Sequence, residues 1–291
     1  MVENKKSFDY TSMADFLYCR RMYDLRHNKG WKINKPATAL SFGGAIGKAL
    51  DSWYTDKEVD KAIQIFKENY TEDTEDDKRT YRLGEWILKN YDKRYQDQPW
   101  KLISRELEFS VPLPNGNNLI GRIDKVVDWN GAVWGVDHKT TSQLGPQFFN
   151  FSEPNLQFMG YSYALIAKGY DVKGFVVDAI LVAKGLIPQT SSLGKPIPPS
   201  TSLTPLARYD IYHKPEHIAE WLDSVQKIQA DIKQCEETNT WYPNFTSCVG
   251  KYGDCQFRKV CKEEEKYRQK ILEMDYTIEC GNPLSINQDS N

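Results

Sequence analysis

Residues 118–139 read NLIGRIDKVVDWNGAVWGVDHK and carry the clearest structural signal in the chain. Apolar and polar residues alternate through 118–128 and again through 132–139, which is the period of a half-buried strand. Asn130-Gly131 separates the two runs, and an Asn-Gly pair in this position is the strongest short-range signal for a β-hairpin. Another alternating run, 102–112, precedes them across a turn at residues 114–117. The sequence therefore predicts a meander of three strands.

Candidate catalytic and metal-binding side chains lie on this predicted meander. Asp137 and Lys139 project from one face of the third strand because side chains alternate, while His138 projects from the other. Closing the hairpin brings Asp124 of the second strand close to Asp137. Two carboxylates so close repel each other unless a divalent cation lies between them, and hard oxygen ligands suit Mg²⁺ or Mn²⁺. With Lys139 near a phosphate oxygen, this set could hydrolyse a phosphodiester. The alternative is a surface ion pair on an exposed sheet face.

Helical patterns and further strands flank the meander. Helices are expected at 11–28, 40–54, 58–69, 78–95, 154–167, from Pro215 onward and at 262–272. Strands are expected at 174–182 and 207–212, with a loop rich in Pro, Ser and Thr at 185–205. This order predicts an α/β fold, an α+β arrangement with a mixed sheet. We expect one domain over residues 1–291, with a helical region at 8–97, a core at 101–214, a helix and cysteine segment at 215–272 and a tail at 273–291.

The composition is that of an ordinary globular protein. The chain has 291 residues, of which 40% are hydrophobic and 27% charged, which excludes wholesale disorder and a collagen-like fibre. No uninterrupted apolar run approaches the roughly 18 residues that cross a bilayer. Residues 1–6 are polar, so no secretory signal is visible. We expect a cytoplasmic protein without membrane contacts, whose cysteines stay reduced.

The charges are unevenly distributed although the formal net charge is only −2. Residues 18–35 contain six basic residues and one acidic residue, whereas residues 51–77 contain ten acidic and three basic residues. The basic segment is a candidate surface for a polyanion, with phosphate contacts and base stacking. Two solvated helix faces are the alternative. Tyr23 is a second aromatic candidate, but most aromatic residues of this segment could equally belong to the core, where Tyr18 is expected. The candidate nucleic-acid-binding residues are Arg20, Arg21, Arg26, Lys29 and Trp31.

Cysteines crowd the C-terminal part of the chain. Three of the six, Cys248, Cys255 and Cys261, fall within 14 residues. In a reducing compartment such crowding indicates metal binding rather than disulfides. The spacing is not the paired C-x2-C of zinc ribbons. Cys235 and Cys280 are expected to be free thiols.

Three short motifs occur in a fixed order: Gly121-Arg122-Ile123-Asp124, then Asp137-His138-Lys139, then Gln157 with Tyr161. This order resembles the RecB-like branch of the PD-(D/E)XK nuclease superfamily, which has G-x-x-D on one strand, D/E-x-K on the next and Q-x-x-x-Y on the following helix. The resemblance implies a restriction-endonuclease-like αβββαβ core, with an N-terminal helical region and a C-terminal cysteine-cluster segment.

The resemblance also implies a role for each matched residue. Asp124, Asp137 and the backbone carbonyl of His138 would ligate Mg²⁺ or Mn²⁺, and Lys139 would position the attacking water. Gln157 and Tyr161 would contact a nucleotide or the general-base region. Glu106 matches a frequent acid of the family, and Glu108 is its rival for that position.

One position departs from the family pattern. A histidine usually follows a glycine in an early helix, as G-x-x-x-H, and serves as a further metal ligand. Here the corresponding stretch is Gly43-Gly44-Ala45-Ile46-Gly47-Lys48, with Gly47 in place of the histidine. The number of catalytic metals, one or two, therefore stays open. For these glycines we expect close packing of the helix on the sheet.

A subset of RecB-like nucleases, including AddB and CRISPR-associated members, holds an iron–sulfur cluster with one N-terminal and three C-terminal cysteines. The resemblance assigns a [4Fe–4S] cluster to Cys19, Cys248, Cys255 and Cys261, which would clamp the two ends of the chain. Arg20 follows Cys19 where proline is usual, and the spacing from Cys248 is longer than in the commonest version. Zinc is the alternative for the same thiolates, and Cys235 is the alternative to Cys19.

The resemblance implies a metal-dependent DNA nuclease that acts as an exonuclease on single-stranded DNA or duplex ends. Its role would lie in recombination, repair or CRISPR adaptation in bacteria, archaea or their viruses. No G-x-x-x-x-G-K-[ST] motif is present, so a separate helicase or recombination protein would be the partner where processivity is needed. The contrasting hypothesis is a catalytically inactive module that binds DNA or a protein through the same fold.

Overall fold

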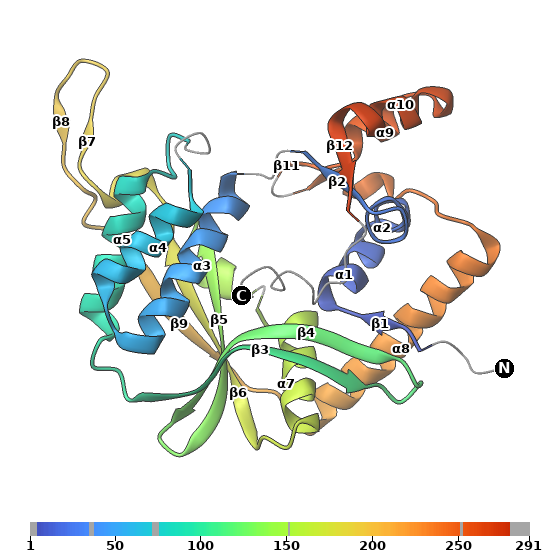
Figure 1. Cartoon of the computed structure of the whole chain (residues 1–291), viewed down its shortest axis with the longest axis horizontal. Coiled ribbons are helices and arrows are strands. Elements are labelled where there is room, and N and C mark those ends of the chain that lie inside the picture. Colours follow the sequence, from blue (N-terminus) through green and yellow to red (C-terminus); the bar gives the residue numbers. More distant parts are fainter. Residues whose placement is uncertain (1–4, 35–37, 72–75, 151, 251–252, 280–291) are drawn as a thin grey trace. The chain divides into compact units, whose positions relative to one another are not determined.

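The computed structural model in Figure 1 describes residues 5–34, 38–71, 76–150, 152–250 and 253–279. The chain divides into two compact units. Unit 1 contains Met1–Lys35, Glu108–Arg122 and Lys214–Asn291, and unit 2 contains Pro36–Leu107 and Ile123–His213. The organisation as one domain stays a prediction. Lys35 and Cys280 lie outside the described residues.

A mixed sheet in the order β1-β4-β5-β6-β9, with β3 paired to β4, forms the centre of the fold. β4 and β5 are antiparallel, and the turn between them places Asn130 at φ 54° and Gly131 at φ 81°, as a two-residue hairpin requires. β5 is parallel to β6, and β6 is antiparallel to β9. The predicted meander and the α/β class with a mixed sheet are confirmed. The strands are β1 (Ser7–Phe8), β3 (Trp100–Pro112), β4 (Asn118–Trp129), β5 (Ala132–Thr141), β6 (Val172–Leu181) and β9 (Leu206–Ile211).

Helices cover both faces of the sheet in unit 2 (Figure 1). Helices α3 (Thr38–Asp56), α4 (Val59–Asn69) and α5 (Tyr81–Tyr95) share an apolar core with the end of β6, including Ile180. Helix α7 (Leu156–Ala167) packs on β6 through Phe158, whose ring lies 5.8 Å from that of Phe175. Ile180 and Phe175 point to opposite faces because strand side chains alternate. The helices expected at 40–54, 58–69, 78–95 and 154–167 are confirmed, and the short α6 (Pro146–Asn150) is an addition.

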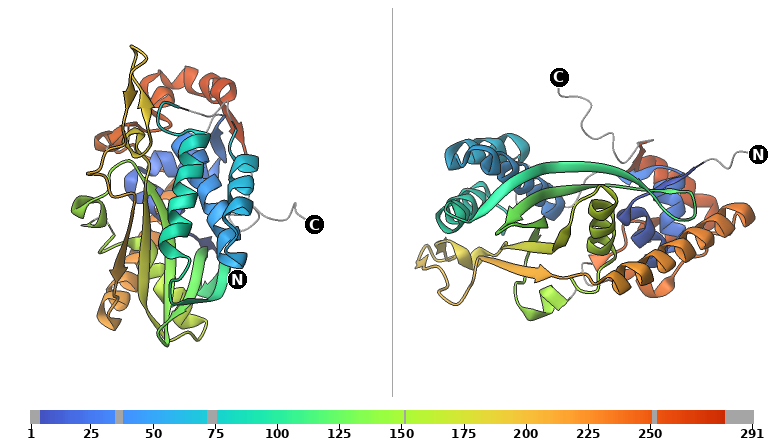
Figure 2. Two further views of the ribbon diagram at one scale, coloured as in Figure 1. Left: turned by 90° about the vertical axis from the view of Figure 1, so that its left-hand side faces the viewer. Right: turned by 90° about the horizontal axis from the view of Figure 1, so that it is seen from below.

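The proline-rich segment contains more regular structure than its composition suggests. A 3₁₀ turn, Lys184–Leu186, precedes a small antiparallel hairpin of β7 (Gln189–Thr190) and β8 (Pro196–Ile197). Figure 2 shows this hairpin projecting from unit 2. Gly194 has φ 75°, a left-handed backbone conformation that glycine adopts easily and that this short turn between β7 and β8 needs. The loop expected at 185–205 is confirmed for most of its length, and the 3₁₀ turn and the small hairpin are additions.

The helix expected at 11–28 is interrupted at Cys19. Helix α1 spans Tyr10–Tyr18, α2 spans Arg20–Tyr23, and a π-helical turn occupies Asp24–Asn28. Cys19 itself is extended, with φ −165° and ψ 117°. Asn244 explains the break, because its side-chain amide donates to the Tyr18 carbonyl at 3.0 Å and its backbone N–H donates to Cys19 Sγ at 3.3 Å. A contact from a distant part of unit 1 thus replaces helical bonds.

Regular structure in unit 1 continues beyond residue 272. Residues 273–275 complete helix α10, and β12 pairs antiparallel with β2, so residues 273–278 do not belong to a tail as expected, while residues 280–291 lie outside the described residues. The Tyr276 ring stacks on Phe257 at 5.2 Å, so burial holds this strand in place. No helix among the described residues is long and apolar enough to cross a membrane. The elements are β2 (Trp31–Ile33), α8 (Pro215–Thr238), a 3₁₀ turn (Phe245–Ser247), β10 (Val249–Gly250), β11 (Gly253–Asp254), α9 (Arg258–Lys262), α10 (Glu265–Asp275) and β12 (Tyr276–Ile278).

Candidate active site

Strands β4 and β5 bring Asp124 and Asp137 together in unit 2. Lys125 pairs with Val136 in the antiparallel ladder, so the next position sets Asp124 beside Asp137. Asp124 Oδ2 accepts a hydrogen bond from the backbone N–H of His138 at 2.9 Å, which fixes this carboxylate against β5. The Asp137 side chain is only 3% exposed. The hairpin thus produces the carboxylate pair that its sequence predicts.

A chain of contacts continues from Asp137 to helix α7. Lys139 Nζ lies 2.8 Å from Asp137 Oδ2 and forms an ion pair with it. The same ammonium donates to Gln157 Oε1 at 3.2 Å, and Gln157 Nε2 donates to the Tyr161 hydroxyl at 2.9 Å. The Lys139 side chain is 40% exposed. It can therefore reach a ligand in solvent while its partners hold its position.

The two carboxylates have opposite pKa shifts. Burial raises the pKa of Asp137 to about 6, and the nearby charge of Asp124 adds to this, while Lys139 opposes it. Burial would also raise the pKa of Asp124, but hydrogen bonds from His138 outweigh it and lower this pKa to about 2. Burial lowers the pKa of His138, and the charge of Lys125 adds to this, while Asp124 and Asp178 oppose it. One acid of the pair is therefore poised to take a proton and the other stays ionised.

The donor set suits a hard divalent cation. Asp124 and Asp137 lie near enough to repel each other electrostatically, and a bound cation would remove that repulsion. Among the described residues, no three His, Cys, Asp or Glu side chains are placed to hold a metal ion together. Mg²⁺ commonly binds through one or two carboxylates and completes its shell with water and phosphate oxygens. The two aspartates therefore suit the metals expected from sequence, and the His138 carbonyl as a further ligand stays a prediction.

Glu106 lies in a strained part of β3. Its φ of 46° is unusual for a residue other than glycine and interrupts the regular alternation that would give Glu106 and Glu108 the same face. Glu106 is among the acids whose charge acts on the ammonium of Lys125. Such strain is common where a side chain serves a site.

Lys125 is a member of this acidic neighbourhood that our sequence reasoning missed. It is 1% exposed, its ammonium lies 4.8 Å from the centre of the Tyr54 ring, and the charges of Asp124, Asp51 and Glu106 act on it. Burial nevertheless lowers its pKa overall. Its position in the sequence could have revealed it, because Lys125 lies two positions from both Ile123 and Val127 and therefore shares their buried face of β4.

The three glycines of α3 differ from one another. A Cβ on Gly43 would lie 2.8 Å from Thr140 Oγ1, so this glycine lets the helix approach β5 closely. Gly44 and Gly47 would meet nothing within 4 Å. Close packing, expected for all three, is therefore correct only for Gly43. Gly47 leaves open space where the family has its histidine.

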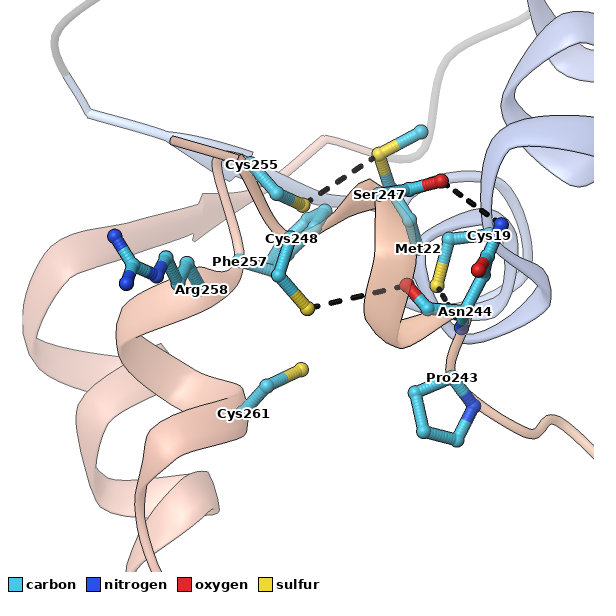
Figure 3. A pocket seen from close by; sticks show the side chains of 10 residues that line it. All are labelled: Cys19, Met22, Pro243, Asn244, Ser247, Cys248, Cys255, Phe257, Arg258 and Cys261. Carbon is cyan, nitrogen blue, oxygen red and sulfur yellow. Dashed lines mark hydrogen bonds between the residues drawn. The ribbon is translucent and has the colours of Figure 1, made fainter. Parts of the chain in front are cut away.

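The four cysteines assigned to a cluster line one pocket in unit 1 (Figure 3). They are Cys19, Cys248, Cys255 and Cys261. Burial raises the pKa of the Cys255 thiol, and the charges of the other three raise it further. These thiols do not form a ligand set for a single metal ion in the described structure. Cys235 is buried in α8 and is absent from this pocket.

The basic segment is mostly engaged in contacts within unit 1. Arg26 pairs with Asp15 at 2.9 Å and Lys29 with Asp24 at 2.6 Å. The guanidinium of Arg20 lies 4.8 Å from the centre of the Phe16 ring and 4.6 Å from that of Tyr242. Arg21 has no ion pair among the described residues. Trp31 and Tyr23 are buried, which favours the alternative that they belong to the core over stacking on bases, whereas Tyr18 is exposed rather than in the core. Because these charges are paired and two of the rings are buried, the segment has fewer side chains available for phosphate contacts and base stacking.

Comparisons with known proteins agree with the geometry. The sequence model of the PD-(D/E)XK nuclease superfamily matches residues 7–262. A crystal structure of a candidate exonuclease from Eubacterium rectale is similar, with 15% identity, 89% of this chain and 88% of that chain covered and a TM-score of 0.53. The structure of LHK-Exo in complex with dAMP matches at 11% identity, 69% and 97% coverage and a TM-score of 0.29, too low to carry an argument. No curated protein sequence matches the chain.

Proposed function

The chain belongs to the PD-(D/E)XK nuclease superfamily, and from this premise we propose that it is a divalent-metal-dependent deoxyribonuclease that hydrolyses phosphodiester bonds. The observation that carries the proposal is Lys139, half in solvent, whose ammonium lies 2.8 Å from Asp137 and 3.2 Å from Gln157. Asp124, Asp137 and the His138 carbonyl would hold Mg²⁺ or Mn²⁺. The chemistry that this ion supplies when bound is polarisation of the phosphate and acidification of water.

The protein's own groups do the positioning. Burial works against the charge of Lys139, but the Asp137 carboxylate outweighs burial and raises its pKa, so the ammonium stays protonated at neutral pH. It can therefore donate to the attacking water or to the negative charge that develops on the phosphate. Gln157 holds this ammonium and also fixes Tyr161, whose hydroxyl stays protonated because burial raises its pKa.

We propose DNA as the substrate and exonuclease action on single strands or duplex ends as the mode. The similarity of fold to a candidate exonuclease supports the mode. A separate helicase or recombination protein would supply processivity, in recombination, repair or CRISPR adaptation. Cutting of linear but not circular single-stranded DNA would support this mode, and equal cutting of both would contradict it.

Degradation of end-labelled single-stranded DNA with Mg²⁺ or Mn²⁺ tests the activity. We expect Lys139→Ala to lower the rate by about 100-fold or more, because a donor to developing charge is lost. Lys173→Ala, an exposed lysine of β6 in the same unit, serves as the matched control and should cut as the wild type does. Equal cleavage by the wild type and Lys139→Ala would overturn the assignment. Binding of DNA without cleavage by the wild type would favour the inactive binding module.

We also propose that Cys19, Cys248, Cys255 and Cys261 hold a [4Fe–4S] cluster. Their shared pocket supports this, as does the N–H of Asn244, which donates to Cys19 Sγ at 3.3 Å. Zinc is the rival, but one ion needs four sulfurs within about 2.3 Å of a single point, whereas four irons span a wider space. About four irons and four sulfides per chain after anaerobic purification would support the cluster, and stoichiometric zinc would refute it.

A further inference from the structure

Behind the acidic site, on the opposite face of β5, His138 lies between two carboxylates. The ring is 5% exposed, and its Nδ1 lies 3.7 Å from Asp124 Oδ2 while its Nε2 lies 3.7 Å from Asp178 Oδ2. Asp124 also accepts the backbone N–H of His138. The side chain and the backbone of one residue thus both border the candidate metal ligand.

Asp178 is a buried charged residue in the apolar part of β6, and two groups donate hydrogen bonds to it. It is fully buried on β6 and accepts hydrogen bonds from Arg208 Nη2 at 3.1 Å and from the Tyr91 hydroxyl at 2.5 Å. The guanidinium carbon of Arg208 also lies 3.6 and 3.8 Å from the centres of the Tyr95 and Trp100 rings. Contacts with two rings and an ion pair with Asp178 restrict the guanidinium, which therefore helps to hold the Asp178 carboxylate.

Tyrosine hydroxyls connect this ion pair to the histidine. The Tyr91 hydroxyl lies 3.4 Å from His138 Nε2 and 2.8 Å from the Tyr54 hydroxyl, and Arg208 Nη2 lies 3.3 Å from both hydroxyls. Every one of these groups belongs to unit 2. A continuous polar network thus extends from Arg208 through Asp178 and Tyr91 to His138, and from there to Asp124.

Stability alone is a poor explanation for these buried charges. A buried ion pair costs desolvation, and apolar residues of similar volume often stabilise a fold equally well or better. Asp178 Oδ1 and Arg208 Nε lack hydrogen-bond partners among the described residues, which adds to the cost. The network ends at Asp124, a candidate metal ligand, and outer-shell contacts of this kind orient a ligating carboxylate for metal binding.

We propose that Asp178 and Arg208 are positioning residues, which hold the His138 ring and through it set Asp124 and the β5 backbone for binding of the divalent cation. The inference rests on the proposed function only for the identity of that site. Neither residue touches the substrate. Their effect passes through His138, and this separates the proposal from a general contribution to packing.

Calorimetric titration with Mn²⁺ tests the proposal without relying on cleavage. Asp178→Asn keeps the volume of the side chain, and we expect it to weaken Mn²⁺ binding roughly tenfold, as loss of an outer-shell partner does. On a His138→Leu background, the same substitution should cause no further loss. Val176→Ala, which removes buried apolar atoms from the same face of β6, is the control and should lower the thermal midpoint but leave the Mn²⁺ Kd unchanged.

Each outcome decides between positioning and packing. Wild-type affinity in Asp178→Asn would overturn the proposal, as would a tenfold loss that persists without His138. If Asp178→Asn does not fold, Tyr91→Phe replaces it, because it removes a single hydroxyl of the network. We then expect the same weakening of Mn²⁺ binding, and no further loss on the His138→Leu background. Wild-type protein that binds Mn²⁺ but does not cut DNA would refute the nuclease proposal and leave the positioning result intact. Absence of Mn²⁺ binding in the wild type would refute both.

Discussion

Asp124 and Asp137 affect folding stability in opposite directions although they lie on neighbouring strands. Asp137 has a pKa raised from 3.8 to about 6, so its contribution to stability is complete below the unfolded value and is lost as the pH rises through 6. Asp124 has a pKa lowered from 3.8 to about 2, so its contribution is present above the unfolded value and is lost as the pH falls through 2. At neutral pH, one carboxylate stabilises the metal-free protein and the other destabilises it.

Asp137→Asn should therefore stabilise the metal-free protein at pH 7.5 by about 3 kcal/mol, because its pKa is raised by about two units and one pKa unit corresponds to about 1.4 kcal/mol. At pH 4 it should have almost no effect. Asp124→Asn, the matched change on β4, should destabilise the protein at pH 7.5. Calorimetric unfolding in a chelator measures both, and shifts of the same sign at pH 7.5 would contradict the assignment of the two pKa values.

Gly47 offers a direct test of the missing histidine. Gly47→His projects into open space from the interior of α3, so the fold should tolerate it and gain a few tenths of a kcal/mol from helix propensity. If an imidazole here reaches the cation, Mn²⁺ binding should tighten at least tenfold, about 1.4 kcal/mol. Gly44 also has open space at its Cβ position, so Gly44→His should gain the same helix propensity but leave the Mn²⁺ affinity unchanged. Equal Mn²⁺ affinity in the two variants would count against a vacant ligand position at Gly47.

At the scale of an element, the β4–β5 hairpin depends on its turn. Gly131 has φ 81° and open space around its Cβ position, so any cost of adding a methyl group comes from the backbone alone. We expect Gly131→Ala to lower the unfolding free energy by about 1 kcal/mol, because an L-residue is strained in this region. Gly145→Ala, equally open but not at positive φ, should lower it much less. Equal losses in thermal unfolding would refute this explanation of the turn.

The break between α1 and α2 shows how a local pattern can mislead. Phe16, Leu17, Met22 and Leu25 recur at helical spacing, and this periodicity continues across Cys19. The sequence therefore could not locate the break, which Asn244 imposes from 225 positions away by binding Cys19 Sγ. The break also turns the Cys19 thiol toward the pocket that it shares with three other cysteines.

At the scale of the whole molecule, the cysteine pocket joins residues near both ends of the chain. If a cluster occupies it, the cross-link should stabilise the protein by about 4–5 kcal/mol in the chain-entropy view, as for a long closed loop. Cys255→Ser should release the metal and lower the thermal midpoint. Cys235→Ser, a buried thiol outside the pocket, should leave the metal content unchanged. Retention of all metal in Cys255→Ser would contradict the assignment.

Local sequence signals were enough for the β4–β5 hairpin and for the set Asp124, Asp137 and Lys139, because these depend on strand alternation and turn chemistry over a few residues. Distant contacts decided the rest. Trp31 is buried rather than available to bases, and Asp178 gains its partner Arg208 from 30 positions further along the chain. Asp178 did leave a trace in the sequence, as a single charge within the apolar run 175–182. Burial and charge compensation depend on which residues meet in space, so the opposite pKa shifts of the two aspartates emerge only when the fold is complete.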